Sequence, residues 1–464
     1  MPGRMSPRHD HGTNCLNNLP LCILARIFVQ SSRLLPACLV CRAFRDMLRR
    51  SEGLRVSLAI KDVGLFKEYV DGKGGALSHC ANIRALDLNS AMERTRILTA
   101  GEYANKFQWM VENALPLLGD LEALHIVSLP PALRTPDGEA MLARSVACLT
   151  RLVTLDIRAY FQADRSWVEA FQQLRGLQHV NLAFNRVGVE GARSMCKCFP
   201  NLTELVSLFL QGNALGSGEA PILLAEAIGA LPRLKELNLA SNKISVDGAL
   251  HLAGAIVALT CLRLLDISRN DFGPKQARSM AEALRPLTGL QHLAIGSNGF
   301  GMKGVVRMAA SVRTLTRLRH LEIERLQLGA EGAGIMAEAM MQLTELEELD
   351  CSSNLLDAEG AELLCETIRS LTRLRDLDLG DNLLADEGAR VVAEAIQPLT
   401  GLRFLYLERN EMGDGAVQYL TAAIRRCSRL QCLDLTENRF GETGGKRLTD
   451  AAALVTCLTD FGFD

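Results

Sequence analysis

Aromatic residues and long apolar runs are both scarce in this sequence of 464 residues. Only 5% of the residues are aromatic although 48% are hydrophobic, so a core has to be mainly aliphatic. No apolar run reaches the roughly 18–20 residues that span a bilayer, and the polar stretch up to Asn14 does not read as an export signal. The formal net charge of −2 gives no overall attraction to nucleic acid or to a membrane surface.

Cysteine is present, with 14 residues, but not in the rhythm of a disulfide-rich secreted domain. We therefore expect reduced thiols, mostly in the core, and a cytoplasmic or nuclear protein. The pair Cys38-x-x-Cys41 has metal or redox spacing, but no second pair stands near it, which favours packing. No motif pairs a nucleophile with a base or builds a phosphate loop, so we expect no catalytic residue, no cofactor, no metal and no enzyme activity.

What the chain has in abundance is an internal repeat. Units such as LEELDCSSN from Leu346 and LRDLDLGDN from Leu374 begin at a constant interval of 28 residues. Each unit reads L-x-x-L-x-L-x-x-N, followed by a turn and by an apolar stripe with helical spacing. Alternating leucines predict a short strand with one buried face, and the stripe predicts a helix. The predicted fold class is therefore an α/β solenoid, a horseshoe with a parallel β-sheet inside and helices outside.

Two other columns recur in the unit. An asparagine closes the strand motif, and we expect it to bond backbone groups that are left open where the strand turns. Leu326 replaces this asparagine in one unit, so that turn should be looser or satisfied by other groups. Gly-Ala pairs such as Gly360-Ala361 and Gly388-Ala389 are suited to close packing of the helix on the preceding turn.

The leucine, asparagine and glycine columns resemble the ribonuclease-inhibitor class of leucine-rich repeats. The clear match runs from about Leu177 onward, and weaker units begin near Leu121 and Leu152, with a further one near Ile83. Phe461 and Phe463 are expected to close the core at the last strand. The resemblance implies the fold and says little about function, because this architecture serves many binding tasks.

The segment 16–58 departs from the repeat and shows two apolar helical stripes followed by arginines. Its order of Leu-Pro, Ile-Leu, Ile-Phe and Val-Cys-Arg resembles an F-box, although the link after Phe28 is short and Pro36 lies early in the second helix. The resemblance implies docking to a Skp-type adaptor and a cullin complex through Leu19, Pro20, Ile23, Leu24, Ile27, Phe28, Leu35, Leu39, Val40 and Phe44. The alternative is a helical cap that seals the first repeat.

We accordingly divide the chain into a disordered tail (1–15), an F-box-like helical domain (16–58), degenerate leading repeats (59–151) and regular repeats (152–464). Counting from the first leucine of a unit, the side chains at positions 3, 5 and 7 should face the concave surface. On neighbouring strands these positions gather carboxylates and two exposed aromatic side chains, which suit a protein client with a basic surface. The predicted client-binding residues are Glu322, Glu324, Glu348, Asp350, Asp376, Asp378, Phe404 and Tyr406. The alternative is a solvated polar face that keeps the sheet soluble.

The sequence thus predicts a substrate-recognition subunit of a Skp–cullin–F-box ubiquitin ligase, with a protein client on the concave face and no nucleic acid or membrane partner. Two alternatives remain. One is a scaffold or inhibitor whose N-terminal helices form a cap, and the other is a regulator of a small GTPase. Nothing in the sequence names the client.

Overall fold

The structure is a computed structural model that describes residues 85–87, 104–105, 107–108, 110–127, 129–158 and 165–463. The chain divides into two compact units, Met1–Leu155 and Asp156–Asp464. The tail and the F-box-like segment (1–58), with all ten predicted adaptor-binding residues, lie outside the described residues.

In the first unit, strand β1 (Ala85–Asp87) pairs in parallel with β2 (Ala123–Ile126). The π-helical turn η3 (Met110–Ala114) and the 3-10 turn η4 (Leu115–Leu117) precede β2, and the 3-10 turn η5 (Pro131–Leu133) and helix α5 (Pro136–Ala147) follow it. Thr135 caps α5, because its hydroxyl accepts the amide of Gly138 at 3.2 Å. Strand β3 (Thr154–Ile157) spans the boundary between the units. A strand thus follows each of the weak unit starts at Ile83, Leu121 and Leu152.

The second unit is a regular alternation of strand and helix. Its strands are β4 (His179–Asn181), β5 (Ser207–Phe209), β6 (Glu236–Asn238), β7 (Leu264–Asp266), β8 (His292–Ala294), β9 (His320–Glu322), β10 (Glu348–Asp350), β11 (Asp376–Asp378), β12 (Phe404–Tyr406), β13 (Cys432–Asp434) and β14 (Asp460–Gly462). Its helices are α6 (Arg165–Gln173), α7 (Gly188–Cys198), α8 (Ala220–Gly229), α9 (Val246–Ile256), α10 (Pro274–Leu284), α11 (Gly301–Val312), α12 (Gly329–Met340), α13 (Ala358–Ile368), α14 (Ala385–Ala395), α15 (Val417–Arg426) and α16 (Glu442–Ala452), with the 3-10 turn η6 (Phe199–Asn201) after α7.

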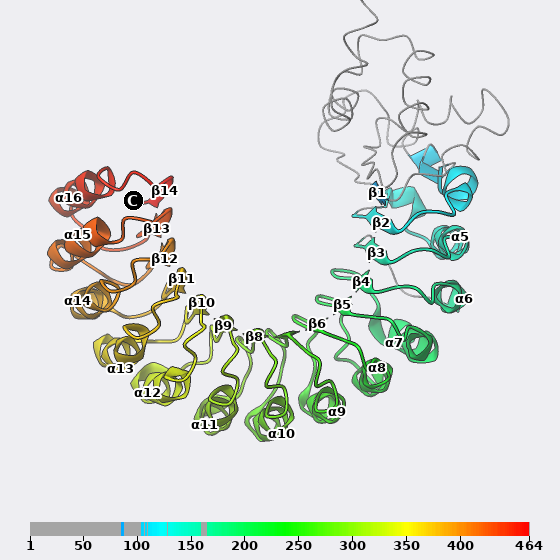
Figure 1. The fold of residues 1–464 in the computed structure, drawn as a ribbon, viewed down its shortest axis with the longest axis horizontal. Coiled ribbons are helices and arrows are strands. Elements are labelled where there is room, and N and C mark those ends of the chain that lie inside the picture. The colour runs from blue at the N-terminus through cyan, green and yellow to red at the C-terminus, as the bar shows by residue number, and fades with distance from the viewer. Residues whose placement is uncertain are drawn as a thin grey trace, which may run out of the picture. The chain divides into compact units, whose positions relative to one another are not determined.

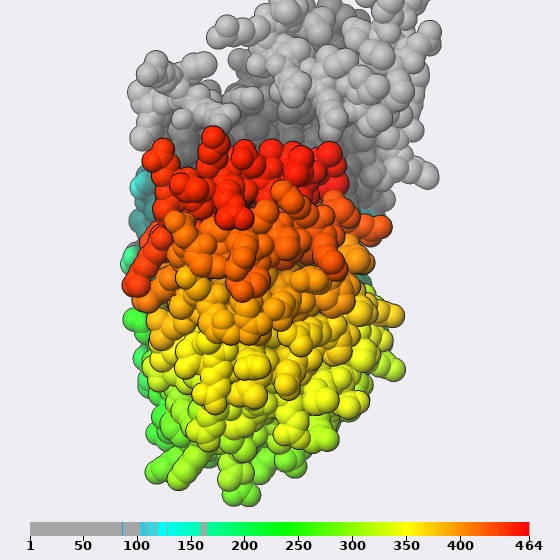
Figure 2. Space-filling model, turned by 90° about the vertical axis from the view of Figure 1, so that its left-hand side faces the viewer, coloured from blue at the N-terminus to red at the C-terminus, as the bar shows by residue number. Residues whose placement is uncertain are grey.

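Within this unit the strands lie in sequence order in one parallel sheet, and equivalent residues pair, as Leu349 does with Leu377 and Leu377 with Leu405. The strands line the inside of an arc and the helices form its outside (Figure 1). Figure 2 looks onto the outer surface at the C-terminal end, where successive repeats lie as bands of colour. The solenoid predicted from the leucine columns is confirmed.

The core is a stack of aliphatic side chains between sheet and helices. The leucine at the centre of each strand from β5 to β13 is at most 1% exposed, as at Leu321, Leu377 and Leu405. Burying a leucine contributes roughly 1.5–3 kcal/mol. The glycine in the first helical turn packs closely on the preceding repeat, because a Cβ at Gly360 would lie only 3.3 Å from the Cα of Ala330. This confirms the role predicted for the Gly-Ala pairs.

The asparagine column joins neighbouring repeats. The side-chain amide of Asn354 donates to the carbonyls of Ile323 (2.8 Å) and Cys351 (3.0 Å), and its Oδ1 accepts the amide of Leu326 at 2.9 Å. Asn213, Asn242, Asn270, Asn382, Asn410 and Asn438 also donate to one carbonyl of their own repeat and one of the preceding repeat. The predicted role is confirmed. At Leu326 the asparagine column is interrupted, and the leucine side chain is buried where the asparagine would lie.

The chain turns sharply at position 8, directly before this asparagine. The residue there has φ between 53° and 57° in repeat after repeat: Phe184, Ser241, Arg269, Ser297, Arg325, Ser353, Asp381, Arg409 and Glu437. Side chains rarely adopt this left-handed conformation, so each turn holds local strain that the asparagine bonds offset. Position 7 therefore already belongs to the turn and not to the strand.

Among the described residues at the C-terminal end, the rings of Phe461 and Phe463 stack with their centroids 6.2 Å apart. Phe463 also lies 5.8 Å from Phe440 and against Gly445 of α16. Both phenylalanines are only half-buried. They cover part of the last repeat, as expected, without being enclosed by it.

Candidate functional site

The inner face of strands β9 to β12 carries seven of the eight predicted client-binding side chains. Positions 3 and 5 form two parallel rows, because paired strands place equivalent residues side by side. One row is Glu322, Asp350, Asp378 and Tyr406, and the other is His320, Glu348, Asp376 and Phe404. We call Glu322, Glu348, Asp350, Asp376 and Asp378 the carboxylate ladder. The structure brings these five carboxylates together as predicted.

The ladder is electrostatically unfavourable where it is partly buried. Burial, together with the nearby carboxylates of Glu348 and Asp350, raises the pKa of Asp376 to about 6. Burial and Asp350 raise the pKa of Asp378 to about 7. Both causes disfavour the charged form, because neither solvent nor a counter-charge compensates it fully. A cationic group placed here would relieve this cost.

The aspartates at position 5 also have a structural task. Asp350 Oδ1 accepts the amide (2.8 Å) and the hydroxyl (2.7 Å) of Ser352, and Asp378 Oδ1 accepts the amide of Gly380 at 2.9 Å. Asn181, Asn238, Asp266 and Asp434 accept the position-7 amide in the same way. This local bond ends the strand. Position 5 therefore serves turn formation in many repeats, and acidic side chains occur at this position outside the ladder as well, at Asp266 and Asp434.

Two histidines border the ladder on its upstream side. The rings of His292 and His320 stack with centroids 5.4 Å apart. His292 Nε2 lies 3.2 Å from Glu322 Oε1, and His320 Nδ1 lies 2.6 Å from Glu348 Oε2. These contacts orient the carboxylates of two ladder members toward β8 and β9.

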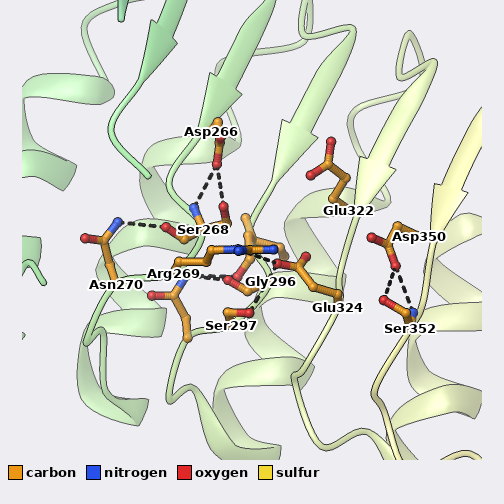
Figure 3. Close-up of polar contacts among 12 residues, drawn as sticks. Asp266, Ser268, Arg269, Asn270, Gly296, Ser297, Glu322, Glu324, Asp350 and Ser352 are labelled. Atoms are coloured by element: carbon orange, nitrogen blue, oxygen red, sulfur yellow. Dashed lines mark hydrogen bonds and ion pairs between the residues drawn. The ribbon is translucent and has the colours of Figure 1, made fainter. Parts of the chain in front are cut away.

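Glu324 does not belong to this exposed surface, which corrects the prediction. Its side chain is 8% exposed, and it folds over Gly296 of the preceding repeat, where a Cβ would overlap its carboxylate. Oε1 accepts the hydroxyl of Ser297 at 3.2 Å and lies 3.8 Å from Arg269 Nε, whereas Oε2 has no hydrogen-bond partner among the described residues (Figure 3). Burial, together with Asp350, raises the pKa of Glu324 to about 7.

The two aromatic side chains are also less exposed than predicted. Phe404 and Tyr406 are half-buried in the sheet surface. The guanidinium of Arg403 lies 5.6 Å from the centroid of the Phe404 ring. Burial raises the pKa of Tyr406 to about 12, with contributions from Cys432 and Asp376. Both side chains are therefore only partly accessible next to the ladder.

The described residues show no enclosed chemical site. No group of three or more His, Cys, Asp or Glu side chains there is arranged to hold a metal ion. No helix in that part of the chain is long and apolar enough to traverse a membrane. The described cysteines are unpaired, and only Cys198, Cys351, Cys365 and Cys427 are buried, so the expectation of core thiols holds for these four.

A family model described as leucine-rich repeat matches residues 174–196, 231–253 and 370–393. The chain carries leucine-rich repeats. No F-box family model matches it. No curated protein matches the chain. Among solved structures, an internalin from Listeria monocytogenes is 16% identical, with a TM-score of 0.45, over 90% of this chain and 89% of the internalin. A leucine-rich-repeat protein from Leptospira interrogans is 18% identical, with a TM-score of 0.43, over 91% of this chain and 98% of that protein.

Sequence reasoning missed a pairing that occurs twice in the leucine-rich repeats. At position 7, Glu324 follows Gly296 one repeat later, and Glu408 follows Gly380 in the same way. Burial raises the pKa of Glu408 too, and its Oε2 has no hydrogen-bond partner among the described residues. Glycine at position 7 of one repeat and glutamate at position 7 of the next is the signal that would have shown Glu324 to be buried and Glu408 to be half-buried.

Proposed function

We propose that this protein is a non-catalytic scaffold that binds a basic segment of a partner protein across strands β9 to β12. The carboxylate ladder is the observation that supports the proposal. Five carboxylates stand on three neighbouring strands, about 4.8 Å from strand to strand. Lysine or arginine side chains of an extended segment approach both rows, and the accessible parts of Phe404 and Tyr406 extend the surface by one strand.

The raised pKa values give this proposal a specific signature. A bound cation favours the charged form of Asp376 and Asp378, so binding releases protons wherever these groups are protonated in the free protein. Affinity for a basic segment should therefore increase from about pH 5 to about pH 8 and then level off. A solvated polar face with no partner has no reason to show this dependence.

We further propose that the bound protein is presented to a ubiquitin ligase, with the segment from Leu19 to Phe44 as the dock for a Skp-type adaptor. The support is the order and residue type of the Leu-Pro, Ile-Leu, Ile-Phe and Val-Cys-Arg elements in the sequence. In this arrangement the chain contributes proximity, and the covalent chemistry takes place on other subunits.

The client surface is tested with a lysine- and arginine-rich peptide of about ten residues, titrated calorimetrically into the full chain. Charge reversal by Glu348→Lys with Asp376→Lys should weaken binding by about tenfold or more. Both positions avoid the turn bonds of Asp350 and Asp378. Glu366→Lys on the outer face of α13 is the matched control and should change little. Equal affinity of both variants would refute the ladder as the binding surface.

The adaptor proposal is tested separately by co-purification with a recombinant Skp-type adaptor. The double substitution Leu19→Ala and Pro20→Ala should abolish recovery of the adaptor and leave peptide binding unchanged. If the unsubstituted chain recovers no adaptor while peptide binding persists, the ligase role is refuted and the protein remains a binding scaffold.

A further inference from the structure

A hollow of about 630 Å³ opens at the edge of the sheet where β11, β12 and β13 begin. Its wall is formed largely by four exposed arginines, Arg373, Arg375, Arg403 and Arg429, with Glu347 at one side. All of these residues precede the strands, at or near the first leucine of a repeat. The hollow is therefore made of different residues from the carboxylate ladder and carries the opposite charge.

Little within the protein neutralises these guanidinium groups. Arg375 Nη1 lies 2.9 Å from Glu347 Oε2, which accounts for one of the four charges. Arg403 donates from Nε and Nη2 to the neutral side-chain oxygen of Gln431, at 3.2 and 2.8 Å. Among the described residues, no carboxylate lies within 4.0 Å of Arg373, Arg403 or Arg429. Three uncompensated arginines thus face one cavity.

The hollow exists because Gly401 interrupts a column of side chains. Arg373, Gly401 and Arg429 each directly precede the first leucine of consecutive repeats. A Cβ at Gly401 would meet only the carbonyl oxygen of Leu374, at an ordinary 3.7 Å, so packing of the backbone does not demand glycine there. The missing side chain leaves the space between Arg373 and Arg429 open.

We propose that this hollow binds a small anion that carries two or more phosphate groups. Guanidinium groups bind phosphate in a bidentate manner, and each phosphate supplies up to two charges in a small volume. Arg373 and Arg429 stand two repeats apart, about 10 Å at the usual strand spacing, which exceeds the reach of a single phosphate. The cavity volume lies in the range of small-molecule sites, about 300–1,000 Å³. Carboxylates carry one charge each and would fill the space before balancing the arginines.

The full chain is titrated with inorganic tripolyphosphate at about 0.1 M salt, where exposed charges are partly screened. The double substitution Arg373→Gln and Arg429→Gln should weaken binding by about a hundredfold, at roughly tenfold for each lost charge-assisted contact. Arg317→Gln is the matched control, because Arg317 precedes the first leucine of another repeat and does not line the hollow. Equal affinity of the double variant and the control, or no binding at millimolar tripolyphosphate, would overturn the proposal.

A second pair of variants tests the cavity without removing charge. Gly401→Leu should fill the hollow and abolish binding, whereas Gly289→Leu at the same repeat position should not. Thermal unfolding should be similar for both, since a Cβ at Gly289 also meets only a backbone oxygen, at 3.8 Å. Undiminished binding by a folded Gly401→Leu protein would place the anion elsewhere and refute the site.

Comparison of anions tests the ligand class. Inorganic monophosphate should bind much more weakly than tripolyphosphate, because it cannot reach both outer arginines. Citrate binding as tightly as tripolyphosphate would overturn the assignment to phosphate. ATP is included to distinguish the source of the phosphates. Tighter binding of ATP than of tripolyphosphate would identify the ligand as a nucleotide. Equal binding would show that only the phosphate chain is recognised. Both results support the proposal.

Discussion

Replacing Glu324 by glutamine should make the protein more stable at neutral pH and leave its stability in acid almost unchanged. The pKa of Glu324 rises from 4.5 to about 7 on folding, chiefly because the carboxyl is buried over Gly296. The folded state therefore holds its proton more tightly than the unfolded state. The contribution of this group to the free energy of unfolding is fully present below about pH 4.5. It falls as the pH rises to about 7 and is constant above that.

The size of the effect follows from the shift in pKa. A difference of about 2.5 pKa units corresponds to about 3 kcal/mol at 1.36 kcal/mol per unit. Glutamine resembles the protonated carboxyl in shape and carries no charge. The free energy of unfolding of Glu324→Gln should consequently be about 3 kcal/mol higher than that of the parent protein at pH 8. The difference should shrink toward pH 4.5.

The assay is urea unfolding of the parent and the variant at several pH values between 4.5 and 8.5. Since solenoids can unfold in parts, hydrogen exchange of the Ser297 amide, which donates to the Glu324 carbonyl at 2.7 Å, provides a local measure. Glu366→Gln on the exposed face of α13 is the control and should show no such dependence. A stability difference for Glu324→Gln that stays constant over this pH range would refute the reasoning.

Three further outcomes are expected. Gly296→Ala should destabilise the protein by about 1–3 kcal/mol, because the new methyl group overlaps the Glu324 carboxylate, and Glu324→Ala in the same chain should recover part of that loss in urea unfolding. Asn354→Ala should cost about 1–3 kcal/mol, since it leaves buried backbone groups of two repeats without partners, and a loss below a few tenths in the same assay would contradict the role of the column. Asp350→Asn keeps an acceptor for the turn and removes a charge, so the pKa of Asp378, followed by NMR titration, should fall. An unchanged value would show that the charge of Asp350 does not contribute to it.

The sequence predicted the repeat architecture well because its determinants are local or recur at a fixed interval. A leucine such as Leu377 needs only its counterparts in the adjacent repeats to be buried, and the repeat supplies them. The asparagine column follows the same logic, since each side chain bonds carbonyls of its own and the preceding repeat. The partners of these residues could be inferred without coordinates.

The error at Glu324 has a geometric cause. Alternation of inward and outward side chains holds only within a strand, and β9 ends at Glu322. The chain has begun to turn by position 7, so Glu324 points across the sheet edge and over the neighbouring repeat. The burial of the Glu324 side chain depends on the residue at position 7 of the neighbouring repeat. A sequence pattern that considers one repeat at a time does not reveal this dependence.

The arginine hollow could not be predicted for a related reason. Its four arginines come from three consecutive repeats, and the space between them depends on the absence of a side chain at Gly401. Each arginine, considered singly, reads as an ordinary solvated surface residue. Only the placement of Arg373 and Arg429 on either side of that glycine makes them a group.

The glycine–glutamate pairs restrict how the repeats can be rearranged. Modules of a solenoid are often treated as interchangeable, so that one can be deleted, duplicated or moved to another place in the stack. Here the unit that contains Glu324 fits behind a unit with glycine at position 7, and Ser352 occupies that position in the unit that follows it. If the Glu324 unit were duplicated, the glutamate of the second copy would fold over the glutamate of the first copy and not over a glycine. The position-7 residues therefore constrain which repeats can be neighbours. A shortened or extended version of the protein has to keep each glycine–glutamate pair in adjacent repeats.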